Sequence, residues 1–311
     1  MPISWGGVMF PWSSWRTLFP LLLGFFGIIG FILYEGYIIS QPLINLRIFK
    51  SRTAVVNYIG TVLHGVILWC MLYYLPLYYE AVKGYSATMT GVAIFPETFT
   101  VAPMVIITGI LVSITGRYRW AIWIGWVIFI LGLGLLCLLG PDTSIPAFVF
   151  LNLVPGIGAG FLFCGPEYAI QAAVLEKDSG LAITMFSFSR TLGQSIGVAI
   201  GGVIFQTRLR IELQSLPAFK ATASEMSRNA SALVQVIKSM EQGSEERVML
   251  VGAYSRSLRV VWAVMCGIAV VGGLLSLATE GLSIDRELGS EQAFIHEDKV
   301  AAGDVEKVVK E

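Results

Sequence analysis

Long apolar runs alternate with short polar connections along most of the chain. Seven of these runs approach or exceed the roughly 20 apolar residues that a helix needs to cross a bilayer core of about 30 Å. The predicted spans are 17–37, 54–79, 89–115, 120–140, 145–173, 182–206 and 258–279. The second, the fourth and most of the seventh contain no Asp, Glu, Lys or Arg. The pattern predicts an all-α, polytopic membrane protein with seven transmembrane helices.

Basic residues in the short connections give these helices an orientation. The connections expected on one side carry Arg47, Lys50, Arg52, Arg117, Arg119 and Lys177. The short connections on the other side carry only Arg16 and Lys83. Because Lys and Arg in short loops favour the cytoplasmic side, we expect the N-terminus outside and the C-terminus inside. The long loop 207–257 is also basic and would lie outside, but long loops follow this rule poorly.

The polar stretches divide the chain into three parts. Residues 1–53 would hold an external lead, one transmembrane helix and a cytoplasmic linker. Residues 54–279 would hold six transmembrane helices and the amphipathic, partly helical external loop 207–257. Residues 280–311, with nine acidic and four basic residues, are predicted to be a disordered cytoplasmic tail. The sequon that begins at Asn229 is either a glycosylation site on the external loop or an unused sequon.

The composition excludes several classes of protein. Apolar residues make up 55% of the 311 residues and charged residues only 14%, whereas soluble domains carry about 25% charged residues. Such a chain is not a disordered protein, a nucleic-acid binder or a secreted disulfide scaffold. The four cysteines lie inside apolar runs and there are only two histidines, so we expect no metal site and no cofactor.

Three ionisable residues interrupt the predicted spans. An ionisable side chain in mid-membrane costs about 2.5–3.5 kcal/mol on insertion scales, so each one needs a reason to be there. Glu97 follows Pro96 in the third span and has no basic residue nearby in the sequence. Because a carboxylate is costly to bury as an anion, Glu97 is a candidate for substrate contact or proton transfer. The alternative is a protonated or water-facing carboxyl with a packing role.

The other two ionisable residues have opposite charges. Glu167 in the fifth span and Arg190 in the sixth lie at similar depth, towards the cytoplasmic side. We predict an ion pair between them, since pairing would neutralise both charges. The pair would be either a gate that opens between conformations or a static structural contact.

Uncharged polar residues supply further candidates. Asn57, His64 and Met71 share a seven-residue spacing and therefore one face of the second span. That face could line a cavity for an amphipathic, aromatic-rich ligand. Gln171 in the fifth span is either a further substrate contact or a hydrogen-bonding residue between helices.

Glycines are spaced four residues apart in two consecutive spans. Gly193, Gly197 and Gly201 lie on one face of the sixth span, and Gly156 and Gly160 share that spacing in the fifth. Small residues at this spacing let two helix backbones approach closely. The pattern predicts tightly packed helices of the kind that transporters rock against each other.

Four stretches carry a family likeness: WGGVMFPWSSW at 5–15, YYLPLYYEAVKGYSATMTGVAIFPE at 73–97, TGRYRWAIWIGW at 115–126 and RTLGQSIGVAIGGVIFQ at 190–206. In order and spacing they resemble the major facilitator superfamily, and most closely its fungal 14-helix drug:proton antiporters. That group includes multidrug and mycotoxin efflux pumps. The likeness covers about residues 5–280 and is specific for the family rather than for a substrate.

The resemblance also extends to a loop signature of the superfamily, written G-x-x-x-D-R-x-G-R-R/K. Gly109, Gly116 and Arg117 match it, while Ser113 and Ile114 stand where the Asp and the Arg would be. The resemblance therefore does not imply a conformational charge network at this loop.

The resemblance implies that the chain is the C-terminal half of a transporter, preceded by the second of two extra central helices. The whole protein would export small hydrophobic organic compounds, such as drugs, toxins or secondary metabolites, in exchange for protons. It would sit in the plasma membrane, with substrate between its two halves. The implied partners are the lipid bilayer, the substrate, protons, and either a missing N-terminal half or a second copy of this chain.

Other classes fit the sequence less well. The main alternative is a non-transporting half-transporter that acts as a regulatory or dimerising membrane subunit. A seven-helix receptor would carry Asp-Arg-Tyr or Asn-Pro-x-x-Tyr motifs, and neither occurs. An intramembrane enzyme is disfavoured because the sequence lacks His-Glu-x-x-His, Gly-x-Ser-x-Gly and phosphate-loop motifs. We therefore expect a protein that is not an enzyme and that uses an ion gradient.

Overall fold

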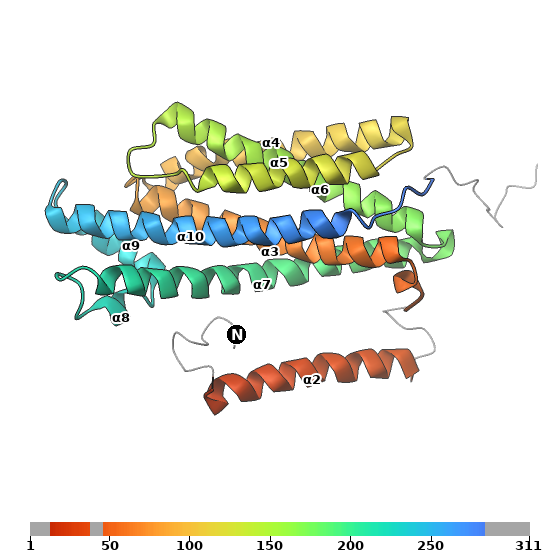
Figure 1. Cartoon of the computed structure of the whole chain (residues 1–311), viewed down its shortest axis with the longest axis horizontal. Coiled ribbons are helices and arrows are strands. Elements are labelled where there is room, and N and C mark those ends of the chain that lie inside the picture. Colours follow the sequence, from red (N-terminus) through yellow and green to blue (C-terminus); the bar gives the residue numbers. More distant parts are fainter. Residues whose placement is uncertain (1–12, 38–45, 284–311) are drawn as a thin grey trace, which may run out of the picture.

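Six long helices run alongside one another, and a seventh lies beside them (Figure 1). The computed structural model describes residues 13–37 and 46–283. The bundle consists of α3 (Arg52–Ala81), α4 (Ala87–Thr115), α5 (Arg119–Leu136), α6 (Ile145–Ala173), α7 (Ser179–Gln214) and α10 (Glu245–Ser276). The separate helix is α2 (Trp15–Tyr37). The described residues contain no strand, so the all-α prediction is confirmed.

Each of the seven predicted spans coincides with a helix, although α5 ends at Leu136 and α10 at Ser276, a few residues before the predicted ends. Not all seven helices are long and apolar enough to cross a membrane. Five helices are long and apolar enough to cross a membrane: α3, α4, α5, α6 and α10. The apolar stretch of α2, Trp15–Phe31, is shorter. α7 has 36 residues, but its sequence includes Arg190 and several Gln, Ser and Thr residues, and it is not among the five. The predicted external lead, part of the predicted linker and almost all of the polar tail lie outside the described residues.

α7 and α10 both extend into the long loop predicted at 207–257. α7 continues to Gln214 and α10 begins at Glu245, so the non-helical connection and its short helices, 215–244, make up about three-fifths of the predicted loop. The reason is that the extra turns of these two helices pack together beyond their most apolar parts, burying Leu209, Leu213 and Tyr254.

Two short helices lie within this connection: α8 (Ala223–Met226) and α9 (Ala230–Ser239). α9 buries Leu233, Val234 and Ile237, and Lys238 lies 3.7 Å from the Glu80 carboxylate of α3. The connection therefore folds back onto the end of the bundle.

Glycines bring the backbones of α3 and α7 into direct contact. Gly193, Gly197 and Gly201 of α7 are buried and form one stripe that faces α3. A Cβ atom added at Gly193 or at Gly197 would lie 2.1 Å from a carbonyl oxygen of α3. In the other direction, a Cβ at Gly65 of α3 would lie 2.5 Å from the carbonyl oxygen of Arg190. Only glycine fits at these positions without moving the helices apart.

α6 lies between α4 and α5 and uses a different set of glycines for each neighbour. A Cβ at Gly156 would lie 2.5 Å from the carbonyl oxygen of Glu97 in α4, and Gly160 faces the same helix. Gly158 faces α5, where a Cβ would lie 2.5 Å from the Phe129 nitrogen. The position of Glu97 is therefore set by its backbone contact with α6.

Substitution of Gly197 should test the α3–α7 contact. We expect Gly197→Ala to destabilise the chain by about 1–3 kcal/mol, because the new methyl group has no room against the α3 backbone. The measurement is the midpoint of thermal unfolding in detergent. Gly134→Ala in α5 is the matched control, since a Cβ there meets nothing within 4 Å. Equal midpoints for the two variants would contradict this account of the packing.

Candidate functional site

Glu97 is enclosed by the bundle. Its residue is fully buried, and neither carboxylate oxygen has a hydrogen-bond partner among the described residues. The few buried residues of α4 form one stripe, Thr90, Ala93, Glu97, Thr108 and Val112, whereas most of the helix is exposed and apolar. Glu97 therefore points towards α6 rather than towards lipid, and its carboxyl group is left without compensation.

A polar pair that the sequence analysis missed lies one helical turn from Glu97. Asn152 of α6 is buried, and its Nδ2 donates to the Tyr79 hydroxyl at 2.6 Å and to the Ala93 carbonyl at 3.0 Å. The Asn152 side-chain oxygen has no partner among the described residues. This pair joins α3, α4 and α6. Its only sequence signal is a lone Asn in an apolar span.

His64 is packed among aromatic rings. It is 1% exposed, its ring meets Phe129 and Phe163 edge to face at 5.4 and 5.3 Å, and neither ring nitrogen has a partner among the described residues. The predicted shared face of Asn57, His64 and Met71 is buried at all three positions. In this conformation the face packs inside the bundle.

Arg190 and Glu167 do not form the predicted ion pair in this structure. The Arg190 guanidinium donates to the Phe163 carbonyl at 3.0 Å and lies over the rings of Phe163 and Phe186, 4.0 and 4.4 Å from their centroids. Glu167 instead accepts a 3.4 Å hydrogen bond from Gln171 on its own helix. The physical reason is that the guanidinium group binds instead to the rings of Phe163 and Phe186 and to the Phe163 carbonyl, while its Nε has no hydrogen-bond partner among the described residues. Phe163 thus contacts both His64 and Arg190.

The remaining predicted residues have local contacts. The Asn57 Nδ2 donates to the Thr53 carbonyl at 2.8 Å and to the Thr279 hydroxyl at 3.1 Å, which ties the start of α3 to the residues after α10. The exposed Asn229 caps α9, because its side chain accepts from the Ala232 amide at 3.0 Å. That cap gives the sequon asparagine a structural role.

The three residues of the loop signature lie at or near the end of α4. Gly116 ends the helix in the left-handed region, with φ of 63°. Arg117 is exposed, and Gly109 lies beside α6, where a Cβ would meet the Cys164 sulfur at 3.7 Å. The signature thus shapes a turn in this chain.

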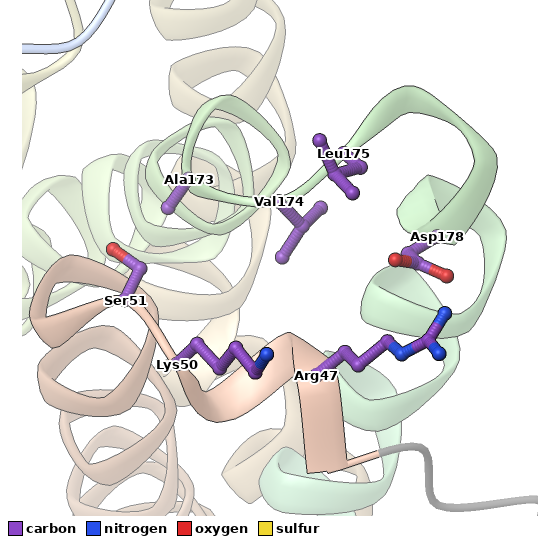
Figure 2. A pocket seen from close by; sticks show the side chains of 7 residues that line it. All are labelled: Arg47, Lys50, Ser51, Ala173, Val174, Leu175 and Asp178. Carbon is purple, nitrogen blue, oxygen red and sulfur yellow. The ribbon is translucent and has the colours of Figure 1, made fainter.

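A pocket of about 450 Å³ opens where α3 begins. Arg47 and Lys50 of η1 (Leu46–Phe49) and its flank line one side, and Val174, Leu175 and Asp178 of the α6–α7 connection line the other (Figure 2). None of the predicted site residues lines this pocket.

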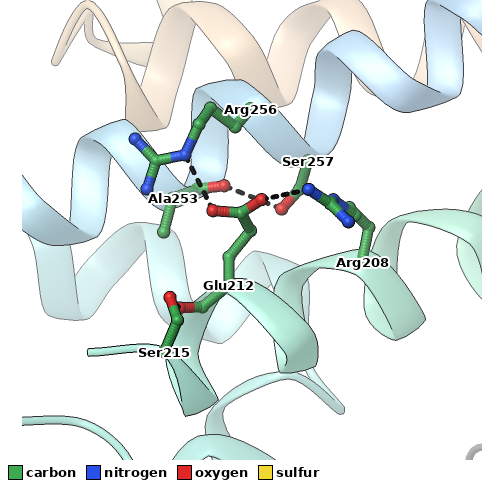
Figure 3. A network of polar contacts seen from close by, with 6 residues as sticks. All are labelled: Arg208, Glu212, Ser215, Ala253, Arg256 and Ser257. Atoms are coloured by element: carbon green, nitrogen blue, oxygen red, sulfur yellow. Dashed lines mark hydrogen bonds and ion pairs between the residues drawn. The ribbon is translucent and has the colours of Figure 1, made fainter. Parts of the chain in front are cut away.

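An ionic network joins α7 and α10 at the opposite end of the bundle. The Glu212 carboxylate accepts from Arg208 at 2.6 Å and from Arg256 at 2.7 Å (Figure 3). The Glu212 side chain is 10% exposed, while the two arginine side chains are about half exposed. The sequence analysis missed this network because it placed all three residues in the external loop. The sixth predicted span ended before Arg208, and the seventh began after Arg256.

The sequence is similar to those of several known proteins. A comparison with protein-family models finds no match. The chain is 46% identical over 300 residues to the MFS transporter L2 of Phoma sp.. It is 32% identical over 303 residues to the MFS-type efflux pump LUC4 of Fusarium sp., and 32% identical over 295 residues to the acurin A biosynthesis cluster MFS-type transporter of Aspergillus aculeatus. These alignments cover 94–96% of this chain.

The chain is homologous along nearly all of its length to fungal MFS-type transporters. It spans about half the length of the curated relatives it matches, which is 50% of the Phoma protein and 53% of each of the other two. The family likeness found in the sequence is therefore confirmed.

The hydrogen bond between Asn152 and Tyr79 can be tested in this chain with a double-mutant cycle. We expect Asn152→Ala and Tyr79→Phe to be coupled by about 0.6–1.7 kcal/mol, the range typical of hydrogen bonds between membrane helices. The measurement is reversible unfolding in mixed micelles of the single variants, the double variant and the parent. Additive effects would contradict a direct bond. The pair Asn57→Ala and Tyr79→Phe, which share no bond, is the control.

Proposed function

We propose that this chain is the C-terminal half of a proton-coupled MFS exporter of small hydrophobic organic compounds in the plasma membrane. The observation that carries the proposal is the buried, unpaired carboxyl group of Glu97. Two of the relatives support export, since one is named an efflux pump and another is named for a biosynthesis cluster. Transporters of this kind have a reason to place an ionisable group inside the membrane region.

The environment of Glu97 suits proton exchange. A buried carboxylate without a partner is costly, and a bound proton removes that cost. If helix motion opens the α4–α6 contact to water, the same carboxyl group can release its proton. Glu97 would therefore take up a proton on one side of the membrane and lose it on the other, with substrate moving in the opposite direction. We assign it this role or direct substrate contact.

The other predicted residues have secondary roles in this proposal. His64 and Arg190 both contact Phe163, so they connect α3, α7 and α6. Gln171 donates a hydrogen bond to the Glu167 carboxylate, one turn away on the same helix. When the helices move, Arg190 would exchange its aromatic contacts for Glu167, and His64 and Asn57 would become accessible to substrate.

Export requires the other half in this proposal. α4 presents a broad exposed apolar face that includes Phe95, Phe99, Ile106 and Ile110. In a complete transporter part of that face meets lipid and part meets the preceding half. The chain alone should then fail to move substrate.

A chimera tests the proposed function. The chain would replace the matching half of the Phoma MFS transporter in a yeast strain that lacks its major efflux pumps. We expect the chimera to lower the retention of hydrophobic fluorescent dyes and a protonophore to abolish that effect, while the chain alone has none. Export by the chain alone would contradict the need for a second half. A chimera that reaches the plasma membrane but exports no compound of a broad panel would overturn the proposal.

Glu97→Gln in the same chimera tests the proton step. We expect normal expression and loss of proton-coupled export, because the amide keeps the shape but cannot release a proton. Export by this variant at the parent rate would remove Glu97 from the mechanism. Gln206→Glu is a control for nonspecific effects of exchanging carboxyl and amide groups. Gln206 is partly buried and lies near the C-terminal end of α7.

A further inference from the structure

A second pocket, of about 710 Å³, lies at the turn between α4 and α5. Its lining includes Arg117, Arg119, Trp120 and Trp123 and, from the stretch after α10, Leu282. This is the end of the bundle that holds the short basic connections and is expected to face the cytoplasm.

The pocket presents donors without acceptors. The Nε of Arg119 and the Nε1 of Trp120 are both buried, and neither has a hydrogen-bond partner among the described residues. Neither Arg117 nor Arg119 forms an ion pair with any residue that the structure describes. The Arg119 guanidinium lies 4.5 Å from the centroid of the Trp123 ring. Two guanidinium-bearing side chains at one pocket favour an anionic ligand with several acceptor oxygens.

An apolar groove begins at the same tryptophan. Trp123 also lines a groove of about 230 Å³ between α5 and α10, together with Trp126, Val127, Val270 and Leu274. The side chains of Val127 and Leu274 are largely exposed, on the outer side of these two membrane helices. A charged pocket at the membrane end of the bundle thus adjoins an apolar groove along the membrane-facing surface.

We propose that the pocket and the groove together bind an anionic glycerophospholipid of the cytoplasmic leaflet. The phosphate would lie against Arg117 and Arg119, and one acyl chain would follow the groove between α5 and α10. Anionic lipids are concentrated in that leaflet and attract basic residues near the membrane surface. The groove distinguishes a lipid from a free phosphate, which would use only the pocket. Export by the whole transporter is not needed for this site.

Lipid titration of the intact 311-residue chain in detergent, followed by native mass spectrometry, tests the proposal. We expect phosphatidylserine to bind more tightly than phosphatidylcholine with the same acyl chains. The double variant Arg117→Gln/Arg119→Gln should lower the affinity for phosphatidylserine by roughly 30-fold, which corresponds to about 2 kcal/mol for the loss of two surface cations. Unchanged phosphatidylserine affinity in this variant would overturn the proposal.

Two further comparisons make the assignment specific. The variant Arg210→Gln/Arg259→Gln makes the same change of charge at arginines that do not line the pocket, and we expect it to bind lipid like the parent. Val127→Trp, which fills the groove, should weaken phosphatidylserine binding. Inorganic phosphate or glycerophosphoserine binding as tightly as the lipid, with no effect of Val127→Trp, would identify a soluble-anion site and overturn the lipid assignment.

Discussion

The direct contact between the backbones of α3 and α7 is the constraint on which the rest of the bundle depends. Glycines on both helices remove the side chains that would otherwise separate them. The contact places the Arg190 backbone against Gly65, next to His64, so that the side chains of His64 and Arg190 both reach Phe163 of α6. A wider spacing would separate these three groups. The glycine stripe therefore sets the geometry of the polar interior as well as the packing.

α6 extends this constraint to the other side of the bundle. Its glycines contact α4 and α5 on different faces, and its Asn152 reaches Tyr79 of α3. The backbone of Glu97 touches α6 at Gly156, which holds the carboxyl group in a buried place without giving it a hydrogen-bond donor. Close helix packing thus occurs in the same region as a buried carboxyl group that has no hydrogen-bond partner among the described residues. Such a combination suits a group that must change its protonation state when helices move.

The sequence predicted the helices and the close glycine packing, because each depends on a local pattern of apolar or small residues. It singled out Glu97 but left open whether its carboxyl group is buried or faces water. It did not predict the partner of Arg190. Depth in the membrane says nothing about rotation around the helix axis, and a long side chain can select an aromatic face over a carboxylate. The Asn152–Tyr79 bond depends on the register between two helices distant in sequence. The ends of α7 and α10 were missed because packing, rather than hydropathy, extends them.

The extra length of α7 and α10 has a consequence for the membrane itself. At 1.5 Å per residue, helices of 36 and 32 residues are about 54 and 48 Å long, well beyond a bilayer core of about 30 Å. Their overhanging turns are joined by Glu212 and its arginines, so they remain ordered outside the hydrocarbon. A bilayer core thick enough to reach these turns would have to bury the charges of Glu212 and its two arginines, which is costly. The network should therefore fix the level at which the hydrocarbon ends on this side of the bundle, whatever the length of the helices.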